Sequence, residues 1–469
     1  MQQLLPLHRL LPVIALLSVC DGFTLAAEIR RPNILVIVAD DMGFADVGFN
    51  GCQDIPTPHI DSLAKNGVVC TNGYVSGCVC SPTRSGLMTG RYQQRFGNEL
   101  NPQGLPSAKN IDQGLALSET TMPQRLKNAG YVTGMVGKWH LGHRHDLIPT
   151  SRGFDEFFGF LGGQHGYRPV PDEKGPTAIH RNGVVVKEEE YLTTAFGREA
   201  AAFITKSRQT PWFLYLPFNS VHTPLHATAE KLEQFAEIDD AKRRTYAAMQ
   251  SSMDDAIGMV LETLRTTGQE ENTLIFFFSD NGGPLEVNGS RNGNLRGKKG
   301  ETWEGGIHVP FVVQWKAKLP AGQKCVHPVI QLDVLPTALA AAGIEISSDW
   351  KLDGVNLLPA LTSNDAAPPH DALYWRNQSR FAIRDADWKL VKSGKIAGKA
   401  TVTDAELYNL REDPSESRNL AAAEPEKVRS LADKWEAWNK TLVPPRWGNK
   451  PDPGGAVEEP KPRKKKKQI

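Results

Sequence analysis

The stretch that decides the fold of this 469-residue chain is Ile34-Leu35-Val36-Ile37-Val38-Ala39-Asp40-Asp41. Its first six residues are apolar and mostly β-branched, which is typical of a strand buried on both faces of a parallel sheet. Two further runs of this kind occupy residues 211–218 and 273–279, and the second ends directly at Asp280-Asn281. The sequence therefore predicts a buried sheet with polar side chains at the ends of two strands.

Helical segments alternate with these strands. Thr121-Met122-Pro123-Gln124 has the pattern of a capping box, and Gly130 is expected to end the helix that it opens. The other elements predicted here are a strand at 131–136, a long helix at 241–264, a strand at 308–315 and a helix at 333–343, with Asp333 as cap and Gly343 as stop. This order predicts an α/β fold, a large, mostly parallel or mixed doubly wound sheet flanked by helices, over residues 28–364. Ligands of such sheets bind beyond the carboxyl ends of the strands.

The character of the sequence changes near residue 365. Short strand-like pieces at 372–375, 381–383 and 388–391 are separated by turn residues, and a helix is expected at 425–441. We therefore predict a small C-terminal antiparallel subdomain over residues 365–443. Residues 444–469 are rich in Pro, Gly and charge and end in a lysine run, so we expect a disordered basic tail that is solvated rather than bound to anionic glycans.

The first 27 residues have the pattern of a secretory signal peptide. His8 and Arg9 precede an apolar run at 10–19, and the small residues Ala26 and Ala27 offer a cleavage site. The run is too short to cross a bilayer, and Val19 is bulky for a residue that precedes a lipidated cysteine, which disfavours both kinds of anchor. We expect the mature protein to be exported, to the periplasm or the medium, without a membrane span.

The composition argues against nucleic acid as a partner and indicates that not all cysteines are paired. The chain has 54 Lys and Arg against 53 Asp and Glu, a formal net charge of +1, so no overall field attracts nucleic acid and we expect none as a partner. Six cysteines are present, and removal of Cys20 with the signal peptide leaves an odd number. At least one thiol is then unpaired or modified in an oxidising compartment, but the spacing of the cysteines reveals no pairing.

The strongest chemical signal is Cys78-Val79-Cys80-Ser81-Pro82-Thr83-Arg84. Cys80 stands where a helix is expected to begin, and there backbone N–H groups and the helix dipole stabilise an anion. Arg84 follows one turn later on the same face. Such neighbours lower a thiol pKa or hold an anionic substrate, which makes Cys80 a candidate nucleophile. The alternatives are a Zn²⁺ site shared with Cys78 and an inert buried cysteine.

A metal site is predicted from the strand ends. Asp40, Asp41, Asp280 and Asn281 supply hard oxygen ligands, which suit Ca²⁺ or Mg²⁺ rather than Zn²⁺. Either pair alone is weak evidence, because Asp and Asn after a strand are ordinary turn formers. Together, the two pairs indicate one site.

The cysteine motif resembles the signature of the type I, formylglycine-dependent sulfatases of the alkaline phosphatase superfamily, in particular relatives of arylsulfatase A and N-acetylgalactosamine-6-sulfatase. Cys80, Pro82 and Arg84 meet the family pattern Cys-x-Pro-x-Arg, and Thr83 departs mildly from the usual Ser or Ala. The resemblance implies that a maturation enzyme oxidises Cys80 to formylglycine, whose aldehyde hydrate is the nucleophile. It also implies that the four oxygen ligands and the formylglycine at Cys80 bind one divalent cation, usually Ca²⁺.

The resemblance extends to further segments and assigns roles to their residues. In Gly137-Lys138-Trp139-His140, Lys138 is expected to bind formylglycine and His140 to act as the base that releases sulfate. His222 matches a histidine that contacts the sulfate and the leaving oxygen, and either it or Lys299 is expected to protonate the leaving alcohol. Lys299, rather than Lys298, matches the sulfate-binding lysine, and Arg84 joins in stabilising charge on the sulfuryl group. Without the resemblance, lone Lys and His residues in loops are usually structural or solvated.

Two histidines are less certain members of this set. His226 is a weaker candidate than His222 for a site residue. His308 stands where most relatives have Arg, which leaves the role of that position open.

The function implied is hydrolysis of sulfate esters, those of sulfated carbohydrates above all, with a small-molecule or polysaccharide ester as substrate. One rival is a phosphonate or phosphate ester hydrolase of the same superfamily, and another is a catalytically dead glycan-binding protein with an unconverted cysteine. A Gly-rich loop with Gln164, His165, Tyr167 and Arg168 either reaches a sugar or is a plain surface loop. The sulfated position and the sugar do not follow from the sequence.

Overall fold

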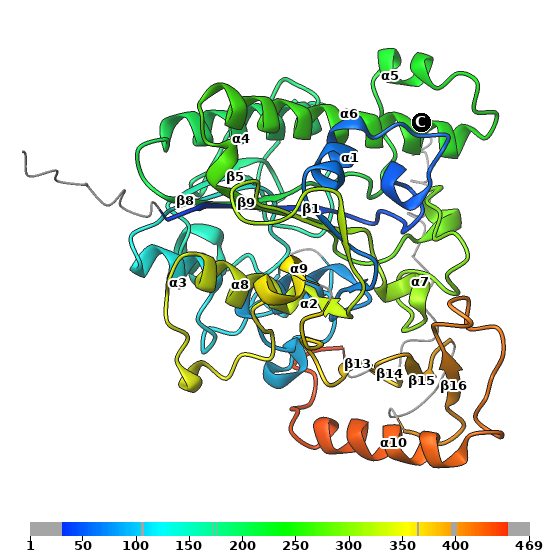
Figure 1. Ribbon diagram of the computed structural model, residues 1–469. Coiled ribbons are helices and arrows are strands. Elements are labelled where there is room, and N and C mark those ends of the chain that lie inside the picture. The colour runs from blue at the N-terminus through cyan, green and yellow to red at the C-terminus, as the bar shows by residue number, and fades with distance from the viewer. Residues whose placement is uncertain are drawn as a thin grey trace, which may run out of the picture. The chain divides into compact units, whose positions relative to one another are not determined.

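The computed structural model describes residues 31–448 except for 105–106, 172, 176, 364 and 395–400. Its centre is a ten-stranded mixed sheet (Figure 1). In spatial order the strands are β11 (Gln323–Cys325), β2 (Val68–Cys70), β10 (Phe311–Gln314), β9 (Thr273–Ser279), β1 (Asn33–Ala39), β8 (Trp212–Pro217), β4 (Val132–Lys138), β5 (Glu156–Phe160), β6 (His180–Arg181) and β7 (Val184–Val185). The strands from β9 to β5 are parallel, whereas β10 runs antiparallel to β9. The predicted mixed α/β sheet is confirmed.

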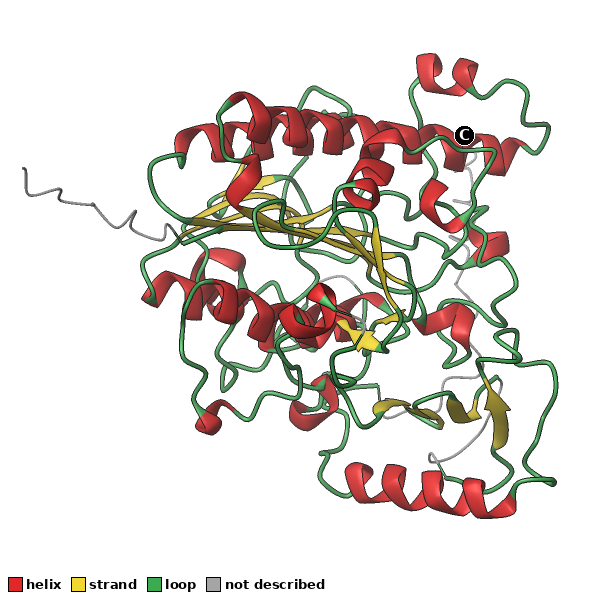
Figure 2. Ribbon diagram, in the orientation of Figure 1, coloured by secondary structure: helices red, strands yellow, loops and turns green. Residues whose placement is uncertain are grey.

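Helices cover both faces of this sheet, as Figure 2 shows. One face packs against α1 (Pro58–Lys65), α4 (Leu192–Lys206) and α6 (Ala241–Thr266), and α5 (Ala229–Gln234) lies on α6. The other face packs against α2 (Cys80–Thr89), α3 (Met122–Asn128), α8 (Val334–Ala341) and α9 (Leu358–Thr362). Successive residues of a strand point to opposite faces. Accordingly, Leu35 and Ile37 of β1 belong to the first core, and Val36 and Val38 to the second. The continuous apolar run of β1 is explained by burial on both sides.

The predicted helix caps and strand bounds agree with the structure in some places and differ in others. Thr121 and Gln124 form the predicted capping box at α3. The strand expected at 308–315 is shorter, because β10 begins only at Phe311 after α7 (Glu304–Ile307). Asp333 stands at the N-cap position of α8, as predicted, but its side chain makes no capping hydrogen bond there. Its carboxylate instead accepts hydrogen bonds from the N–H groups of Ile330 and Val355.

The predicted small antiparallel sheet is present. It consists of β13 (Leu373–Asn377), β14 (Arg380–Asp385), β15 (Trp388–Lys392) and β16 (Glu406–Asn409), and α10 (Pro425–Asn439) packs on it. A two-stranded sheet of β3 (Gly73–Tyr74) and β12 (Val329–Ile330) lies in the large domain. Residues 444–448, which were assigned to the disordered tail, are packed instead: Trp447 is buried, and its indole N–H donates to the carbonyl of Leu100.

A buried network of charges joins the four-stranded sheet to α7 and to β3 of the two-stranded sheet. Lys389 of β15 places its ammonium 2.8 Å from Glu304 of α7 and 2.8 Å from Glu416. Tyr74 of β3 donates to Glu304 at 2.6 Å, and Arg384 of β14 in turn donates to the Tyr74 hydroxyl. We call Tyr74, Glu304, His308, Arg384, Lys389 and Glu416 the sheet-to-sheet network. Because its pairs join residues far apart in the sequence, it fixes how the two sheets meet.

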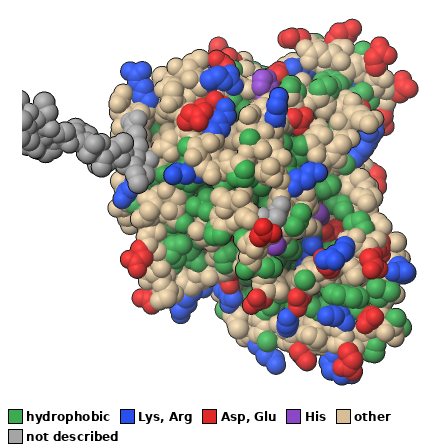
Figure 3. Space-filling model, in the orientation of Figure 1, with side chains coloured by type: hydrophobic (Ala, Val, Ile, Leu, Met, Phe, Trp, Pro, Cys, Tyr) green, Lys and Arg blue, Asp and Glu red, His purple; other side chains and the backbone are tan. Residues whose placement is uncertain are grey.

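Residues 1–30 and 449–469 lie outside the described part of the chain, so the expected signal peptide and most of the expected basic tail are not described. Within the described part, no helix combines the length and the apolar character needed to span a membrane. Acidic and basic side chains are interspersed over the face shown in Figure 3, in keeping with a formal net charge of +1.

Candidate active site

Neighbouring parallel strands bring the predicted residues to one edge of the large sheet. β1 leads into Asp40-Asp41, β9 into Asp280-Asn281, β4 ends at Lys138 shortly before His140, and the loop after β8 carries His222. Because parallel strands place their carboxyl ends together, side chains distant in the sequence meet here. For example, the Asn281 amide donates to the Asp41 carboxylate at 2.7 Å. Asp41 and His140 have left-handed φ angles of 63° and 58°, which turn the chain away directly after each strand.

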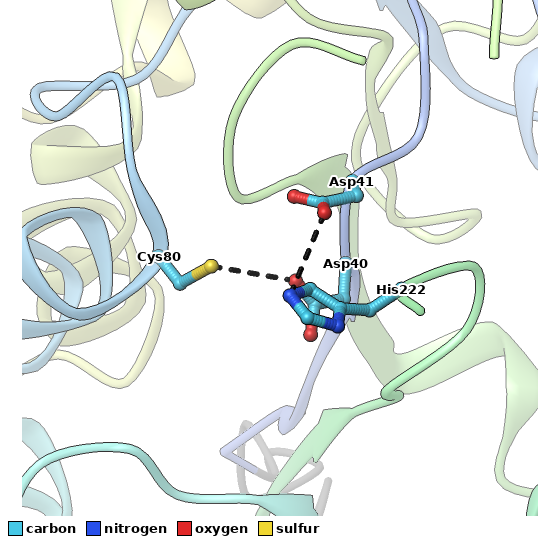
Figure 4. Close-up of side chains that lie close together, drawn as sticks. All are labelled: Asp40, Asp41, Cys80 and His222. Atoms are coloured by element: carbon cyan, nitrogen blue, oxygen red, sulfur yellow. Dashed lines mark hydrogen bonds and ion pairs between the residues drawn. The ribbon is translucent and has the colours of Figure 1, made fainter. Parts of the chain in front are cut away.

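Cys80 points into this cluster from the first residue of α2 (Figure 4). Its Sγ lies 3.5 Å from Asp40 Oδ1 and 3.4 Å from Lys299 Nζ, and the residue is 1% exposed. Burial raises the pKa of the thiol to about 12, and Asp280 adds to the shift. The helix start therefore does not yield a thiolate, because the carboxylates and the lack of solvent outweigh the nearby cations.

The Zn²⁺ alternative finds no support from Cys78. That residue is buried with Tyr92, Trp303 and apolar residues of the small sheet, in a core separate from the two that flank the large sheet. Among the described residues, the group able to ligate a metal is Asp40, Asp41, Cys80 and His222, without Cys78. Burial also raises the pKa of the Cys78 thiol to about 12.

Arg84 lies deeper than the resemblance suggested. Its side chain is fully buried, and its Nε and Nη2 donate to Asp280 Oδ2 at 3.0 and 2.7 Å. Its Nη1 donates to the carbonyl of Lys138 at 3.0 Å. In this structure Arg84 thus orients a carboxylate and the end of β4.

The oxygen donors form a set that fits a hard divalent cation. Three carboxylates, those of Asp40, Asp41 and Asp280, are nearly or fully buried, and Asn281 Oδ1 is buried without a hydrogen-bond partner among the described residues. Burial and Asp40 raise the pKa of Asp280 to about 6, whereas Lys138 and other nearby cations lower the pKa of Asp40 against the effect of burial. A cation such as Ca²⁺ would use these carboxylates together with the unpartnered amide oxygen.

Two lysines balance these carboxylates. Lys138 Nζ lies 2.5 Å from Asp40 Oδ2, and Lys299 Nζ lies 2.7 Å from Asp41 Oδ1. Burial works against the charge of Lys299, but Asp41 and its neighbours raise the pKa of that ammonium well above its usual value. Lys298 points elsewhere, to Glu286 at 3.0 Å, and is 43% exposed. The structure therefore places Lys299, and not Lys298, beside Cys80.

His140 and His222 differ in which ring nitrogen can accept or donate a proton. Burial and Lys138 lower the pKa of His140 well below its usual value, and its Nδ1 has no partner among the described residues, so the ring is neutral and has a nitrogen available. Burial also lowers the pKa of His222. Its Nδ1 lies 2.6 Å from the carbonyl of Thr223 and therefore carries the proton, which leaves Nε2, 3.7 Å from Asp41 Oδ2, as an acceptor. A neutral His222 with this tautomer cannot donate to a leaving oxygen, whereas the Lys299 ammonium can.

The two less certain histidines lie apart from this cluster. His308 stacks near Tyr74 and bonds to Glu304 in the sheet-to-sheet network. His226 packs against the Tyr167 ring, and its Nδ1 is unpartnered among the described residues.

Several supporting residues carried no signal in the sequence. Asn288 donates to the carbonyls of Asp41 and Val221 at 3.1 Å each. Tyr167, which the sequence places in a loop that either reaches a sugar or is a plain surface loop, is fully buried, and its hydroxyl donates to the carbonyl of His222 at 2.8 Å. Both hold the backbone of site residues. A single Asn or Tyr outside a motif gives no hint of such a role.

Comparisons with known proteins agree with this geometry. A family model described as Sulfatase matches residues 32–344, and a second, described as N-sulphoglucosamine sulphohydrolase, C-terminal, matches residues 298–438. Arylsulfatase J of Mus musculus is 33% identical over 90% of this chain and 78% of its own length. N-acetylgalactosamine-6-sulfatase of the same species is 32% identical over 78% and 73%.

Solved structures give the same picture. The crystal structure of Ps i-CgsB, also solved in complex with k-i-k-neocarrahexaose, has a TM-score of 0.83 and 37% identity, and covers 89% of this chain and 95% of that one. The phosphonate monoester hydrolase of Agrobacterium radiobacter, at 20% identity and a TM-score of 0.62 over 88% and 96% of the two chains, shares the fold.

Proposed function

We propose that this chain, which belongs to the sulfatase family and is a sulfuric ester hydrolase, works through a formylglycine made from Cys80 and one bound Ca²⁺. The observation that carries the proposal is the position of Cys80. Its thiol lies at the centre of the site, against Asp40 and Lys299, at the first residue of α2. Pro82 and Arg84 follow it in the family pattern Cys-x-Pro-x-Arg, so the residue that this pattern marks for conversion stands among the metal-binding carboxylates.

Formylglycine supplies a hydrated aldehyde, with one hydroxyl to attack sulfur and a second whose deprotonation lets sulfate leave. The surrounding side chains are suited to that chemistry. Lys138 and Lys299 present buried ammonium groups that stabilise charge on a sulfuryl group. His140 is neutral and can accept a proton, and Lys299 is the protonated group nearest to Cys80 Sγ.

The metal ligands proposed are Asp40, Asp41, Asp280, Asn281 and the modified Cys80. Without a metal, the three carboxylates are offset by three cations, namely Arg84, Lys138 and Lys299. A divalent ion would make the site positive, and an anionic sulfate ester would be drawn to it. Because the carboxylates and cations cancel without a metal, the net positive charge that attracts the substrate would come from the bound ion. We therefore expect the metal to be present when substrate binds.

Conversion of Cys80 requires a maturation enzyme as a partner. In the folded chain Cys80, Pro82 and Arg84 are all buried in α2. An enzyme that recognises these three residues must therefore act before α2 is covered by the rest of the protein. We also propose that the chain is exported through residues 1–27, which mass measurement of the mature N-terminal peptide would test.

We propose a sulfated polysaccharide as the substrate. The support is the likeness to Ps i-CgsB, whose structure holds a neocarrahexaose, and to N-acetylgalactosamine-6-sulfatases. The test is a panel of defined sulfated oligosaccharides, carrageenan-derived and N-acetylgalactosamine-6-sulfate-containing, together with an aryl sulfate and an aryl phosphate. We expect sulfate release from at least one oligosaccharide, and none from it with Cys80→Ala. Turnover confined to the aryl phosphate would contradict the proposal, and mass of the Cys80 peptide distinguishes an unconverted, inactive protein from a wrong substrate.

A further inference from the structure

Two cysteines outside the active site lie opposite each other on adjacent strands. Cys70 is the last residue of β2 and Cys325 the last of β11, and the two are paired in the parallel register of these strands. Residues paired in this way have side chains on the same face of the sheet. Both belong to the second core cluster, where Cys70 is 2% exposed and Cys325 fully buried.

The strand pairing brings the two residues within reach of a covalent link, although both thiols are free in this structure. Neighbouring strands lie about 4.8 Å apart, and the Cα atoms of a disulfide are usually about 4.4 to 6.8 Å apart. The Thr71 N–H donates to the Cys325 carbonyl at 3.0 Å, which holds the two strand ends together. In keeping with this proximity, Cys325 raises the pKa of Cys70, and Cys70 lowers that of Cys325.

We propose that Cys70 and Cys325 are joined by a disulfide bond in the mature protein. The bond forms between the two Sγ atoms as each thiol loses its proton. The two electrons pass to an oxidant that carries its own disulfide, such as a thiol oxidoreductase of the export compartment, and reduce it to a dithiol. The partner cysteines are thereby identified by strand register, which the spacing of cysteines in the sequence could not reveal.

The bond would fasten the strands that lead into the active site. Beyond the cysteines the two segments continue side by side as β3 and β12. They lead to Ser76 and Gln331, whose side chains are hydrogen-bonded, and Gln331 also donates to the carbonyl of Thr83 in α2. A link between Cys70 and Cys325 would therefore restrain the segment that carries Cys80.

The other described cysteines serve as internal controls. Cys52 is partly exposed and hydrogen-bonded to Asp54, and Cys78 lies in a different core cluster. Neither is paired in register with another cysteine among the described residues. We expect both to stay reduced.

The first test uses full-length protein expressed through its own signal sequence into an oxidising compartment. The protein is unfolded in guanidinium chloride at mildly acidic pH with excess N-ethylmaleimide and no reductant, so that free thiols are alkylated before disulfides can exchange, and it is then digested and measured by mass spectrometry. We expect alkylated Cys52 and Cys78 and a cross-linked peptide pair containing Cys70 and Cys325, two hydrogens lighter than the sum of the free peptides. Full alkylation of Cys70 and Cys325, at the level of Cys52, would overturn the proposal. None of these readouts depends on substrate or on conversion of Cys80.

A second test measures thermal unfolding. Cys70→Ala and Cys325→Ala should each lower Tm by about 4 °C, because a link that closes so long a loop restricts the unfolded chain. The double variant should be no less stable than the singles, since the bond is lost once. Cys78→Ala, a buried cysteine with no partner, should add its own effect to either variant. Additive losses for Cys70→Ala and Cys325→Ala would contradict a shared bond.

Discussion

The active site and the sheet-to-sheet network are both clusters of buried charge, but they are built differently. In the network, one ammonium, that of Lys389, bridges the carboxylates of Glu304 and Glu416 at 2.8 Å each. In the site, Arg84, Lys138 and Lys299 pair with three carboxylates, but Asn281 Oδ1 and His140 Nδ1 have no partner among the described residues.

The two clusters therefore serve different purposes. Buried polar groups that are paired within the protein hold two parts of a fold in one arrangement, whereas buried polar atoms left without a partner are arranged for something that binds. Substitutions in the site should therefore cost activity far more than stability, and substitutions in the network should do the reverse.

The sharpest test of the site is Cys80. Cys80→Ala should lower kcat by at least about 10³-fold, because loss of a nucleophile commonly costs that much or more. Cys80→Ser should fold and turn over slowly while sulfate accumulates on the substituted residue, since a serine ester lacks the second hydroxyl needed to expel it. Mass spectrometry of that peptide after exposure to substrate checks the trapping. A fully active wild type with an unmodified Cys80 thiol would contradict the formylglycine proposal.

Asp280 tests the metal. Asp280→Asn keeps the shape of the side chain and an acceptor for Arg84 but removes a charge, so metal content and kcat should fall together, the latter by roughly 10³-fold. Elemental analysis of the purified protein measures the metal, and chelation of the wild type should reproduce the loss. Glu416→Gln, which alters a buried carboxylate of the network, is the control and should keep its metal. Full metal content with full turnover in Asp280→Asn would refute the ligand assignment.

Substitution of Lys389 tests whether the sheet-to-sheet network serves stability rather than activity. Lys389→Met removes the shared cation and leaves two carboxylates buried without it, so the free energy of unfolding should fall by about 3 kcal/mol. Urea unfolding measures that change, and kcat per folded molecule should stay close to that of the wild type. A large loss of kcat at unchanged stability would mean that the network takes part in the site.

The smallest effect on activity distinguishes two adjacent lysines. Lys299→Ala should reduce kcat by about 10²-fold, because its ammonium lies beside Cys80 and Asp41. Lys298→Ala should change it by less than about twofold, since an exposed pair with Glu286 contributes little. Steady-state kinetics on the same substrate compare the two, and a larger loss for Lys298→Ala would reverse the assignment of the site lysine.

The sequence predicted the two main sheets, and it predicted which strand ends meet at the candidate site. Asp40-Asp41 and Asp280-Asn281 could be placed because each pair directly follows a strand with a strong local signal. Their meeting then follows from the rule for parallel sheets. The same holds for Cys80, whose position at a helix start is a local property of its motif.

The sequence could not predict roles that depend on contacts with residues far away in the chain. Asp333 stands at the predicted N-cap position, but Val355 and His370 engage its carboxylate through folding that no local pattern records. Likewise, a nearby helix start indicated a lowered thiol pKa for Cys80, and burial among carboxylates reversed the sign. In each case the tertiary surroundings outweighed a local rule.

The left-handed backbone of Asp41 and His140 has a consequence for engineering. A residue with a side chain in this region costs about 1 kcal/mol or more relative to glycine, and in both positions the side chain faces the chemistry. Glycine at either position would relax the turn and remove a functional group at the same time. Glycine at position 41 would also leave Lys299 and the Asn281 amide without their carboxylate partner, which costs more than the turn gains. The strained turn at Asp41 is therefore retained by the charges around it as well as by its function.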